Sequence, residues 1–325
     1  MSCQLRHALL SSLLLFCLLP EAPAQTAQKA QQPGGDPRIR VEVNLVNVLA
    51  SVTDAAGRPL ADLPAEAFEI YEEGIKQKVQ RFEAETSQPL DLALMIDSSL
   101  STFKELEFER EAAAHFIRQV VRPGDRLAVF QFSEDVSQLS PFSSDVAALQ
   151  AAVRGMGAGA GTAMFDAMIL GSRELRRGAA GRRRVIILVT DAGETTSRGS
   201  FEEARGAALR AEALLYTVLI RPVKSESGRN TAGEHALVTI TDVTGGAMYF
   251  PDSVAELDAM FDRIDRELRT QYRLGFYPEP QPPAGKFRNL EVRVKGCAAA
   301  KPESATAGAP EGCTVRHRKG YFSAE

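Results

Sequence analysis

The sequence predicts a mixed α/β fold, in which a doubly wound, mostly parallel sheet is inserted into a small β-sandwich built from both flanks of the chain. Between residues 89 and 270, short apolar runs alternate with helical patterns, which is typical of a parallel sheet covered by helices on both faces. The flanks, 39–88 and 271–325, instead alternate apolar and polar residues with a period of two. Each flank is short for a separate domain, so we expect the two to pair.

Composition limits the class of protein. The chain has 325 residues, of which 44% are hydrophobic and 25% charged, so a globular core is expected over most of its length. The formal net charge is -4, whereas nucleic-acid-binding proteins are usually basic. Trp is absent and aromatic residues make up 7%, which disfavours a base-stacking or lectin-like surface. We therefore expect no nucleic-acid partner.

Residues 1–24 have the pattern of an export signal. Arg6 and His7 precede an apolar stretch, Ala8–Leu19, and Ala22-Pro23-Ala24 places small residues at the cleavage positions. The alternative is a buried N-terminal helix. No later segment approaches the roughly 20 apolar residues that a membrane-spanning helix needs. The sequence thus predicts an exported protein without a transmembrane segment, located in the periplasm or cell envelope or secreted.

The first flank is predicted to be antiparallel β structure after a disordered linker. Residues 25–38 are rich in Gln, Gly and Pro, which is typical of disorder. Apolar residues alternate over Ile39–Leu45 and then, on the opposite phase, over Val46–Val52, which indicates a strand with a β-bulge. A turn at Asp54–Gly57 and a hairpin over Phe68–Val79 are expected to follow.

The middle of the chain is predicted to alternate strands and helices. Apolar runs predict strands at Leu92–Ile96, Leu127–Phe132, Val185–Val189, Leu215–Ile220 and Ala247–Phe250. Helical spacing of apolar residues predicts helices at Thr102–Val121, Asp145–Met156, Ala163–Arg177, Phe201–Leu214, Glu234–Val243 and Ser253–Arg269.

The second flank returns to the period of two and contains the two cysteines of the mature chain. Tyr272–Phe276 and Leu290–Val294 alternate, and a last strand is expected within Val315–Phe322. Cys3 and Cys17 are lost with the signal. In an oxidising compartment the remaining pair, Cys297 and Cys313, is expected to form a disulfide, with two free thiols as the alternative.

Oxygen-bearing side chains follow two of the predicted strands and one glycine-rich loop. They are Asp97, Ser99, Ser101, Thr162 and Asp191. Ligands of doubly wound sheets bind beyond the carboxyl ends of the strands, so these side chains are expected to meet there. Hard oxygen donors suit Mg²⁺, with Ca²⁺ or Mn²⁺ as alternatives. For Asp97 alone, capping of the following helix would be the simpler interpretation.

The order of these motifs carries a family resemblance. The chain resembles the von Willebrand factor type A domain over roughly Leu90 to Thr270. The resemblance rests on three motifs in order: DxSxS, then Gly-Thr at the start of a helix, then an apolar strand that ends in Thr-Asp. The resemblance implies that these five positions form a metal-ion-dependent adhesion site, partly through water, and that a partner carboxylate completes the metal shell. The flanking LPAEAFEI, YRLGFY and RKGYF resemble an exported bacterial family with related domains.

One departure from that family concerns the first loop. Many relatives have a small residue where this chain has Leu100, between the two serines. A bulky side chain there is expected to stiffen the loop and to contact the partner. The departure affects which partner binds rather than the metal ligands.

Three functions are compatible with this pattern. The favoured one is an exported, metal-dependent protein-binding module for adhesion or scaffolding, without enzymatic activity, whose partner offers an Asp or Glu to the metal. A metal-assisted hydrolase is the second, with Glu194 as its only candidate catalytic residue. The third is a structural subunit of a cell-envelope assembly. The sequence indicates neither the partner's identity nor an oligomeric state.

Two further charged positions have competing interpretations. Asp166, one turn after Thr162, either supports the metal ligands from behind or caps the helix that starts there. The arginines 182–184, before the Val185–Val189 strand, are interpreted as a solvated surface loop.

Overall fold

The computed structural model describes residues 45–84, 87–100, 106–220, 230–251, 256–299 and 312–324. They all belong to one compact unit, Val43–Glu325. The predicted signal, the linker and the strand pattern from Ile39 to residue 44 lie outside these ranges. In the described part of the chain, no helix is long and apolar enough to cross a membrane.

The central sheet of this unit has six strands in the order β10-β9-β8-β5-β6-β7. Its strands are β5 (Leu90–Asp97), β6 (Arg126–Phe132), β7 (Val136–Ser143), β8 (Arg183–Thr190), β9 (Ala213–Leu219) and β10 (Ala247–Tyr249). All neighbours are parallel except β7, which is antiparallel to β6. Every residue of β5 is buried, which explains its continuous apolar run. The predicted fold class is therefore confirmed.

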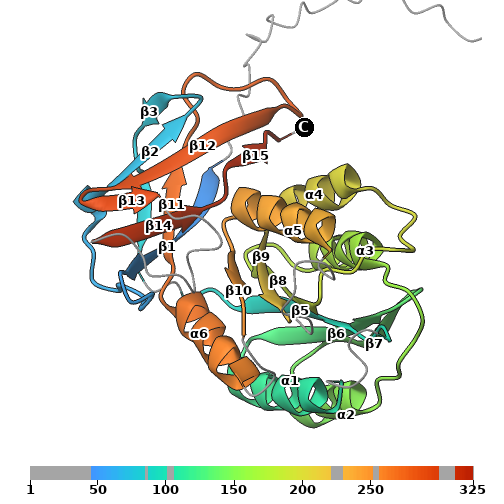
Figure 1. The fold of residues 1–325 in the computed structure, drawn as a ribbon. Coiled ribbons are helices and arrows are strands. Elements are labelled where there is room, and N and C mark those ends of the chain that lie inside the picture. The colour runs from blue at the N-terminus through green and yellow to red at the C-terminus, as the bar shows by residue number, and fades with distance from the viewer. Residues whose placement is uncertain are drawn as a thin grey trace, which may run out of the picture. The chain divides into compact units, whose positions relative to one another are not determined.

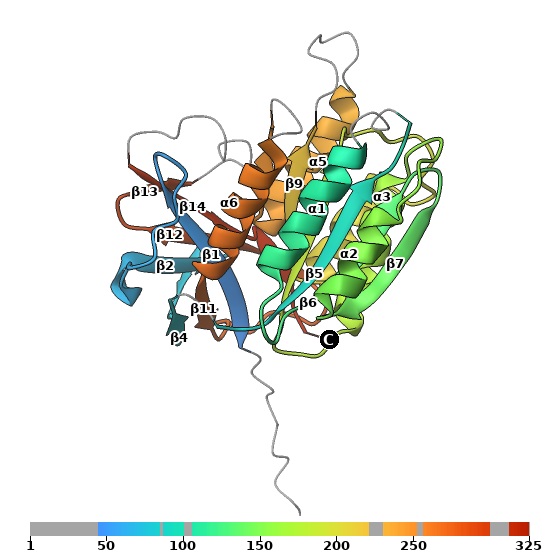
Figure 2. The ribbon, with the colours of Figure 1, turned by 90° about the horizontal axis from the view of Figure 1, so that it is seen from below.

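Six helices cover the two faces of this sheet. They are α1 (Leu106–Val120), α2 (Val146–Arg154), α3 (Met164–Arg177), α4 (Phe201–Arg210), α5 (Thr231–Thr244) and α6 (Leu257–Arg269). Apolar residues of α1, α2 and α6 pack on one face, and those of α3, α4 and α5 on the other (Figures 1 and 2). The apolar stripes at helical spacing thus mark the faces that point to the sheet.

The flanks pair with each other in two further sheets (Figure 1). One has the order β13-β14-β1-β11-β4, from Cys297–Ala299, Cys313–His317, Val46–Asp54, Tyr272–Phe276 and Arg81–Glu83. The other has the order β15-β12-β2-β3, from Gly320–Phe322, Phe287–Val294, Phe68–Glu72 and Ile75–Gln77. Val48, Ile70, Tyr272 and Val292 share one apolar core, to which both sheets contribute.

Strand β7 was not predicted from the sequence. It lies at the edge of the sheet and reads VSQLSPFS, with only Ser140 buried. A polar edge strand lacks the apolar run of a central strand, and its Pro141 is tolerated because an edge strand need not donate every hydrogen bond. The pattern that identified the buried strands is therefore absent here.

The arginines 182–184 do not form a solvated loop. Arg183 is 4% exposed and opens β8, and its Nε donates to the Gln88 carbonyl at 3.1 Å. Arg182 Nε donates to Asp91 Oδ1 at 2.6 Å, and Arg126 binds the same carboxylate. Asp91 is a buried charge on β5, and a buried charge needs a partner. The prediction failed because that need arises from a strand far away in the sequence.

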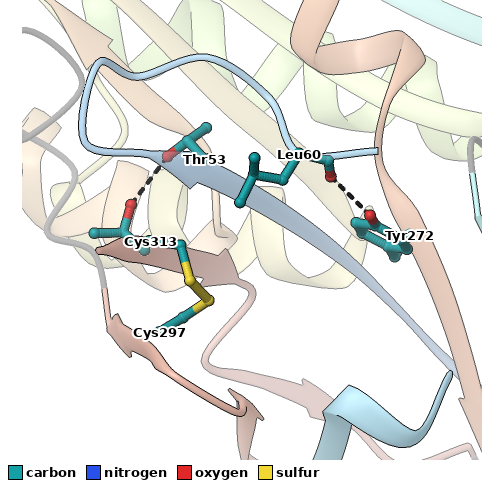
Figure 3. The surroundings of a disulfide bond; sticks show 6 residues. Thr53, Leu60, Tyr272, Cys297 and Cys313 are labelled. Carbon is teal, nitrogen blue, oxygen red and sulfur yellow. Dashed lines mark hydrogen bonds between the residues drawn. A yellow bond between two sulfur atoms is a disulfide. The ribbon is translucent and has the colours of Figure 1, made fainter. Parts of the chain in front are cut away.

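The disulfide between Cys297 and Cys313 is present, as predicted, and joins β13 to its parallel neighbour β14 (Figure 3). Close to it, the Tyr272 hydroxyl donates to the Leu60 carbonyl at 2.7 Å. The Thr53 hydroxyl is hydrogen-bonded to a hydroxyl of β14 at 2.9 Å. The disulfide therefore joins the edge strand β13 to β14, and β14 is in turn paired with β1 in the same sheet.

Removal of this disulfide is expected to lower the free energy of unfolding by about 3 kcal/mol. The two cysteines are 16 positions apart, and closing a loop of about 15 residues restricts the unfolded chain by that amount. Urea unfolding of Cys297→Ser/Cys313→Ser, compared with oxidised wild type, measures the difference. Reduced wild type serves as the control and should match the variant. Equal stability of the oxidised wild type and the variant would contradict the prediction.

His317 is expected to make the fold sensitive to mild acid. The side chain is 3% exposed. Its Nε2 accepts from the Val292 amide at 3.0 Å, and Nδ1–H donates to the Arg318 carbonyl at 2.8 Å. Burial, with the charge of Lys319, lowers its pKa from 6.5 to about 4. The folded protein therefore keeps the ring neutral at a pH at which the unfolded chain takes up a proton.

The free energy of unfolding should consequently fall as the pH drops from 6.5 to 4, with about 3 kcal/mol of the loss due to His317. Denaturant unfolding across this range, in wild type and His317→Gln, isolates that share because all other groups are common to both. We expect a shallower decline in the variant. Parallel curves would show that His317 is not responsible.

Candidate metal site at the carboxyl edge of the central sheet

Strands β5 and β8 are neighbours at the point where the order of the sheet reverses. From β5 the chain continues to β6 on one side, and from β8 it continues to β9 on the other. Such a reversal leaves a crevice beyond the carboxyl ends of the two strands. Asp97 is the last residue of β5, and Asp191 directly follows β8. Two carboxylates thus lie at adjacent strand ends, at the position where ligands of such sheets bind.

Asp97 is held in a defined orientation and is 1% exposed. Its Oδ1 accepts from the Ser99 amide at 3.0 Å, and its Oδ2 accepts from the Thr190 hydroxyl at 2.7 Å. Burial and, to a smaller extent, the charge of Asp191 raise the pKa of Asp97 to about 6, against the lowering effect of the hydrogen bonds from Ser99 and Thr190. An ionised carboxylate at this position is therefore costly unless a cation lies nearby.

The glycine-rich loop reaches the site because glycine allows a close approach. Ser99 forms a β-bridge with Gly159, whose amide donates to the Ser98 carbonyl at 2.9 Å. A Cβ on Gly159 would lie 2.3 Å from Ser133 Oγ, so a larger residue would displace the loop. The loop ends at Thr162, which is 4% exposed and whose amide donates to the Thr195 hydroxyl at 2.9 Å.

The side chains of Thr162 and Asp191 both lie close to Gly193. A Cβ at Gly193 would lie 3.1 Å from Thr162 Oγ1 and 3.0 Å from Asp191 Oδ1. The Gly193 amide donates to the same Asp191 oxygen at 2.8 Å. Ala192, which stands between Asp191 and Gly193 in the sequence, has a φ of 65°. This left-handed conformation costs about 1–3 kcal/mol for a residue with a side chain. Gly233 at the start of α5 packs directly on Ala192, which keeps it in that conformation.

Asp166 and Glu194 both accept hydrogen bonds from backbone amides of the protein. Glu194 Oε2 accepts from the Phe165 amide at 3.0 Å, and Asp166 Oδ1 accepts from the Gly199 amide at 2.8 Å. Both carboxylates thus tie the loop 194–200 to the N-terminal turn of α3. The amides that Asp166 binds belong to Arg198 and Gly199, which precede α4, rather than to the first turn of α3.

Thr190 is the residue of the site that sequence reasoning missed. In the sequence analysis, Thr190 only marked the end of a predicted strand. In the structure, its hydroxyl donates to Asp97 and accepts from the Ala192 amide at 3.1 Å. The sequence did contain a signal for this role, because Thr190 carries a hydroxyl, ends an apolar strand and directly precedes the candidate ligand Asp191. The signal became informative only once β5 and β8 were known to be neighbours.

Ser101 lies outside the described residues. Leu100 is described and is 63% exposed, and Phe108 in the first turn of α1 is 65% exposed. Both are large apolar side chains at the end of the sheet where β5 finishes and α1 begins. The expected exposed residue in the first loop is therefore present, and a second apolar residue lies on the helix that follows.

The donor set has a consistent chemistry. Among the described residues, no three His, Cys, Asp or Glu side chains meet at one point. A cation at this edge would therefore rely on the carboxylates of Asp97 and Asp191 together with hydroxyl and water oxygens. Such hard, partly neutral donors fit Mg²⁺, which keeps several of its waters, better than they fit zinc.

Residues 92–194 match the family model of the von Willebrand factor type A domain. This confirms the resemblance for the part of the chain that contains Asp97, Thr162 and Asp191. The match does not extend to the flanks, whose resemblance to the exported bacterial family stays a prediction. No curated protein matches the sequence.

Solved structures with a similar fold include three from bacteria. A von Willebrand factor type A protein from Catenulispora acidiphila is 12% identical, with a TM-score of 0.49, covering 87% of this chain and 74% of that one. The conserved hypothetical protein BatB from Bacteroides thetaiotaomicron is 17% identical, with a TM-score of 0.45 and coverage of 56% and 100%. The von Willebrand domain of the pilus tip protein Mfa5 from Porphyromonas gingivalis is 13% identical, with a TM-score of 0.45 and coverage of 56% and 95%.

Proposed function

We propose that this chain, with a von Willebrand factor type A match at residues 92–194, is an exported protein-binding module that uses a divalent cation. Mg²⁺ is the preferred ion, with Ca²⁺ or Mn²⁺ as alternatives. The proposed ligands are Asp97, Ser99, Ser101, Thr162 and Asp191. A cation bound there would attract an Asp or Glu side chain of the partner protein. The module would act in adhesion or as a scaffold, without enzymatic activity of its own.

The observation that supports this function is a buried carboxylate, Asp97, whose hydrogen-bond partners are Ser99 and Thr190 and which lies close enough to Asp191 for their charges to interact. Asp97 is 1% exposed, and the hydroxyl of Thr162 and the carboxylate of Asp191 both lie beside Gly193. The hydrogen bond from Thr190 and the packing of α5 on Ala192 hold these groups before any ligand arrives. A preorganised site loses little entropy when a ligand binds.

The chemistry of the surroundings favours binding over catalysis. Both carboxyl oxygens of Glu194 accept hydrogen bonds from the start of α3 and from Ser197. Leu100, after β5, and Phe108, in the first turn of α1, offer exposed apolar area for a protein partner to cover. Export is supported by the signal pattern of residues 1–24 and by the disulfide.

Affinity capture from an envelope extract of the source organism tests the proposal. Immobilised wild type should retain a protein in Mg²⁺ and release it in EDTA. Asp191→Asn should retain none of it, because the metal loses a charged ligand. Asp62→Asn makes the same change at an exposed residue of the β-sandwich flank and should behave as wild type. Retention that is unaffected by EDTA and by Asp191→Asn would refute a metal-dependent function.

Replacement of Leu100 by Ser is expected to weaken partner capture without changing metal affinity. Covering a leucine side chain contributes about 1.5–3 kcal/mol, which corresponds to a tenfold or larger change in the dissociation constant. Surface plasmon resonance with the captured partner and calorimetry with MgCl₂ measure the two effects. Ile75→Ser is the matched control, since Ile75 is 50% exposed but lies on β3. Equal effects of both variants would argue against a contact at Leu100.

A further inference from the structure

A cavity lies at the amino edge of the central sheet, which is the edge opposite the candidate metal site. It has a volume of about 260 Å³. Its walls come from the starts of β8 and β9, from β1 and β11 of the neighbouring sheet, and from the turn after β14. The strands of the central sheet run from this edge toward Asp97, so the cavity and the candidate metal site are at opposite ends of β8.

The walls of this cavity carry an excess of positive charge. They include five arginines and one carboxylate, Glu212, which pairs with Arg318 at 2.7 Å. The arginines are Arg182, Arg183, Arg184, Arg273 and Arg318. Arg182 and Arg273 also have acidic partners outside the cavity wall.

The surplus charge comes from two residues at the start of β8. In the described chain, neither Arg183 nor Arg184 forms an ion pair, and both bind neutral oxygens. Asp125 near Arg183 and Glu212 near Arg184 are the acidic charges that act on them. Arg183 donates to the Gln271 side chain at 3.2 Å, and Arg184 Nη1 donates to the Ala211 carbonyl at 3.1 Å. Burial, together with the charge of Arg269, lowers the pKa of Arg183 to about 10. The cavity is therefore a region where positive charge is crowded and partly desolvated.

Three of these arginines have hydrogen-bonding capacity that the protein does not use. The Nε atoms of Arg184, Arg273 and Arg318 are buried and have no acceptor among the described residues. Arg273 is 7% exposed and Arg318 is 8% exposed, so these are largely buried side chains rather than solvated ones. Buried donors of this kind usually have partners. All three belong to arginines that line this cavity, so the cavity brings three unused donors to one place.

We propose that this cavity binds a small oxyanion, which is a phosphate-, sulfate- or carboxylate-bearing molecule, through Arg184, Arg273 and Arg318. Guanidinium groups match the geometry of such anions and can donate to them in pairs. The anion would balance the charges of Arg183 and Arg184 and accept from the unused donors after small rotations of the side chains. The site requires no metal and does not depend on the proposed function at the other edge.

Isothermal titration of the full mature chain with sodium phosphate, sodium sulfate and sodium succinate, at constant ionic strength, tests the proposal. We expect saturable binding of at least one of the three, and the comparison distinguishes tetrahedral anions from carboxylates. Arg184→Gln should raise the dissociation constant at least tenfold. Arg176→Gln removes the same charge from an exposed position on α3 and should change it less than twofold.

Two further variants keep the outcome decisive. Arg184→Lys retains the charge but not the paired donors, and should bind with intermediate affinity; it replaces Arg184→Gln if circular dichroism shows that variant to be unfolded. Asp97→Asn should bind the anion as wild type does, which separates this site from the metal site. Absence of saturable binding of all three anions by wild type would overturn the proposal. Equal weakening by Arg184→Gln and Arg176→Gln would also overturn it, because a general charge effect would then suffice.

Discussion

Replacement of Asp97 by Asn is expected to abolish the stabilisation of the protein by Mg²⁺. A ligand that binds only the folded state stabilises it by about 2.7 kcal/mol at a concentration of one hundred times its dissociation constant. Asp97 lies at the centre of the proposed donor set, and asparagine keeps its shape while removing its charge. Wild type should thus unfold at a higher denaturant concentration in MgCl₂ than in EDTA, whereas Asp97→Asn should unfold at the same concentration in both.

In EDTA, the variant should be at least as stable as wild type at neutral pH. Burial raises the pKa of Asp97 from 3.8 to about 6. Compared with the unfolded chain, the folded state therefore binds the proton of this acid more tightly. This tighter binding adds to the free energy of unfolding below pH 3.8, and the contribution is lost as the pH rises through 6. The total loss is about 3 kcal/mol. The neutral amide avoids this loss.

Asp62→Asn is the control for the loss of one negative charge and should respond to Mg²⁺ as wild type does. A shift in Asp97→Asn as large as that of wild type would show that Mg²⁺ binds elsewhere. A variant that is much less stable than wild type in EDTA would show that Asp97 is mainly a structural hydrogen-bond acceptor for Ser99 and Thr190.

Replacement of Arg316 by Met is expected to be among the most destabilising changes in the protein. Arg316 lies in β14 and is 6% exposed, and it pairs with Glu267 of α6. The Glu267 carboxylate also accepts from the Tyr216 hydroxyl at 2.6 Å, on β9. Without the arginine, the buried carboxylate of Glu267 lacks its cation, and breaking a buried pair in this way costs about 3–5 kcal/mol.

The reason can be tested by adding Glu267→Gln. The double variant should regain part of the lost stability, because the remaining amide is neutral and still hydrogen-bonds to Tyr216. Denaturant unfolding of both single variants and the double variant completes the cycle. Arg293→Met breaks the exposed pair with Glu291 and should cost less than about 1 kcal/mol. Similar losses in Arg316→Met and Arg293→Met would contradict a role for burial.

This pair also explains how the two parts of the folded unit are joined. Glu267 belongs to the last helix that covers the central sheet, and Arg316 belongs to the sheet built from the flanks. Gln271, at the start of β11, donates to both Ser51 of β1 and Tyr216 of β9 at 3.2 Å. A polar network of this kind is worth more when complete than its separate bonds indicate. We therefore expect the two parts to unfold together.

Strands that are buried on both faces were predictable, and the polar edge was not. The apolar runs of β5 and β8 follow from burial, which acts on every residue of such a strand. Strand β7 has one neighbour and a largely solvated face, so its sequence keeps only a weak pattern. The helices were found for the same reason as the central strands, since α3 and α6 each bury one apolar stripe.

The candidate site could be predicted in outline but not in its contacts. Asp97, Thr162 and Asp191 each stand at the end of a strand or loop that the sequence marks by itself, and the topology of parallel sheets brings such ends together. The partners of Glu194 and Asp166 were not predictable, because the loop 194–200 folds back on α3. Whether a carboxylate is exposed, caps a helix or lines a crevice depends on elements that are distant in the sequence.

The sequence alone determined the alternation of strands and helices, the order of the oxygen donors and the pairing of the two cysteines. The alternation and the order of the donors depend on burial and on local spacing, which single segments record, whereas the cysteine pairing follows from the two cysteines that remain after the predicted signal. Only the tertiary structure decided that Thr190 holds Asp97 and that Arg183 is buried. The same is true of the arginine-lined cavity, whose walls come from β1, β8, β11 and the turn after β14. Which charges share a buried space depends on the order of strands in a sheet, and no single segment of the sequence contains that order.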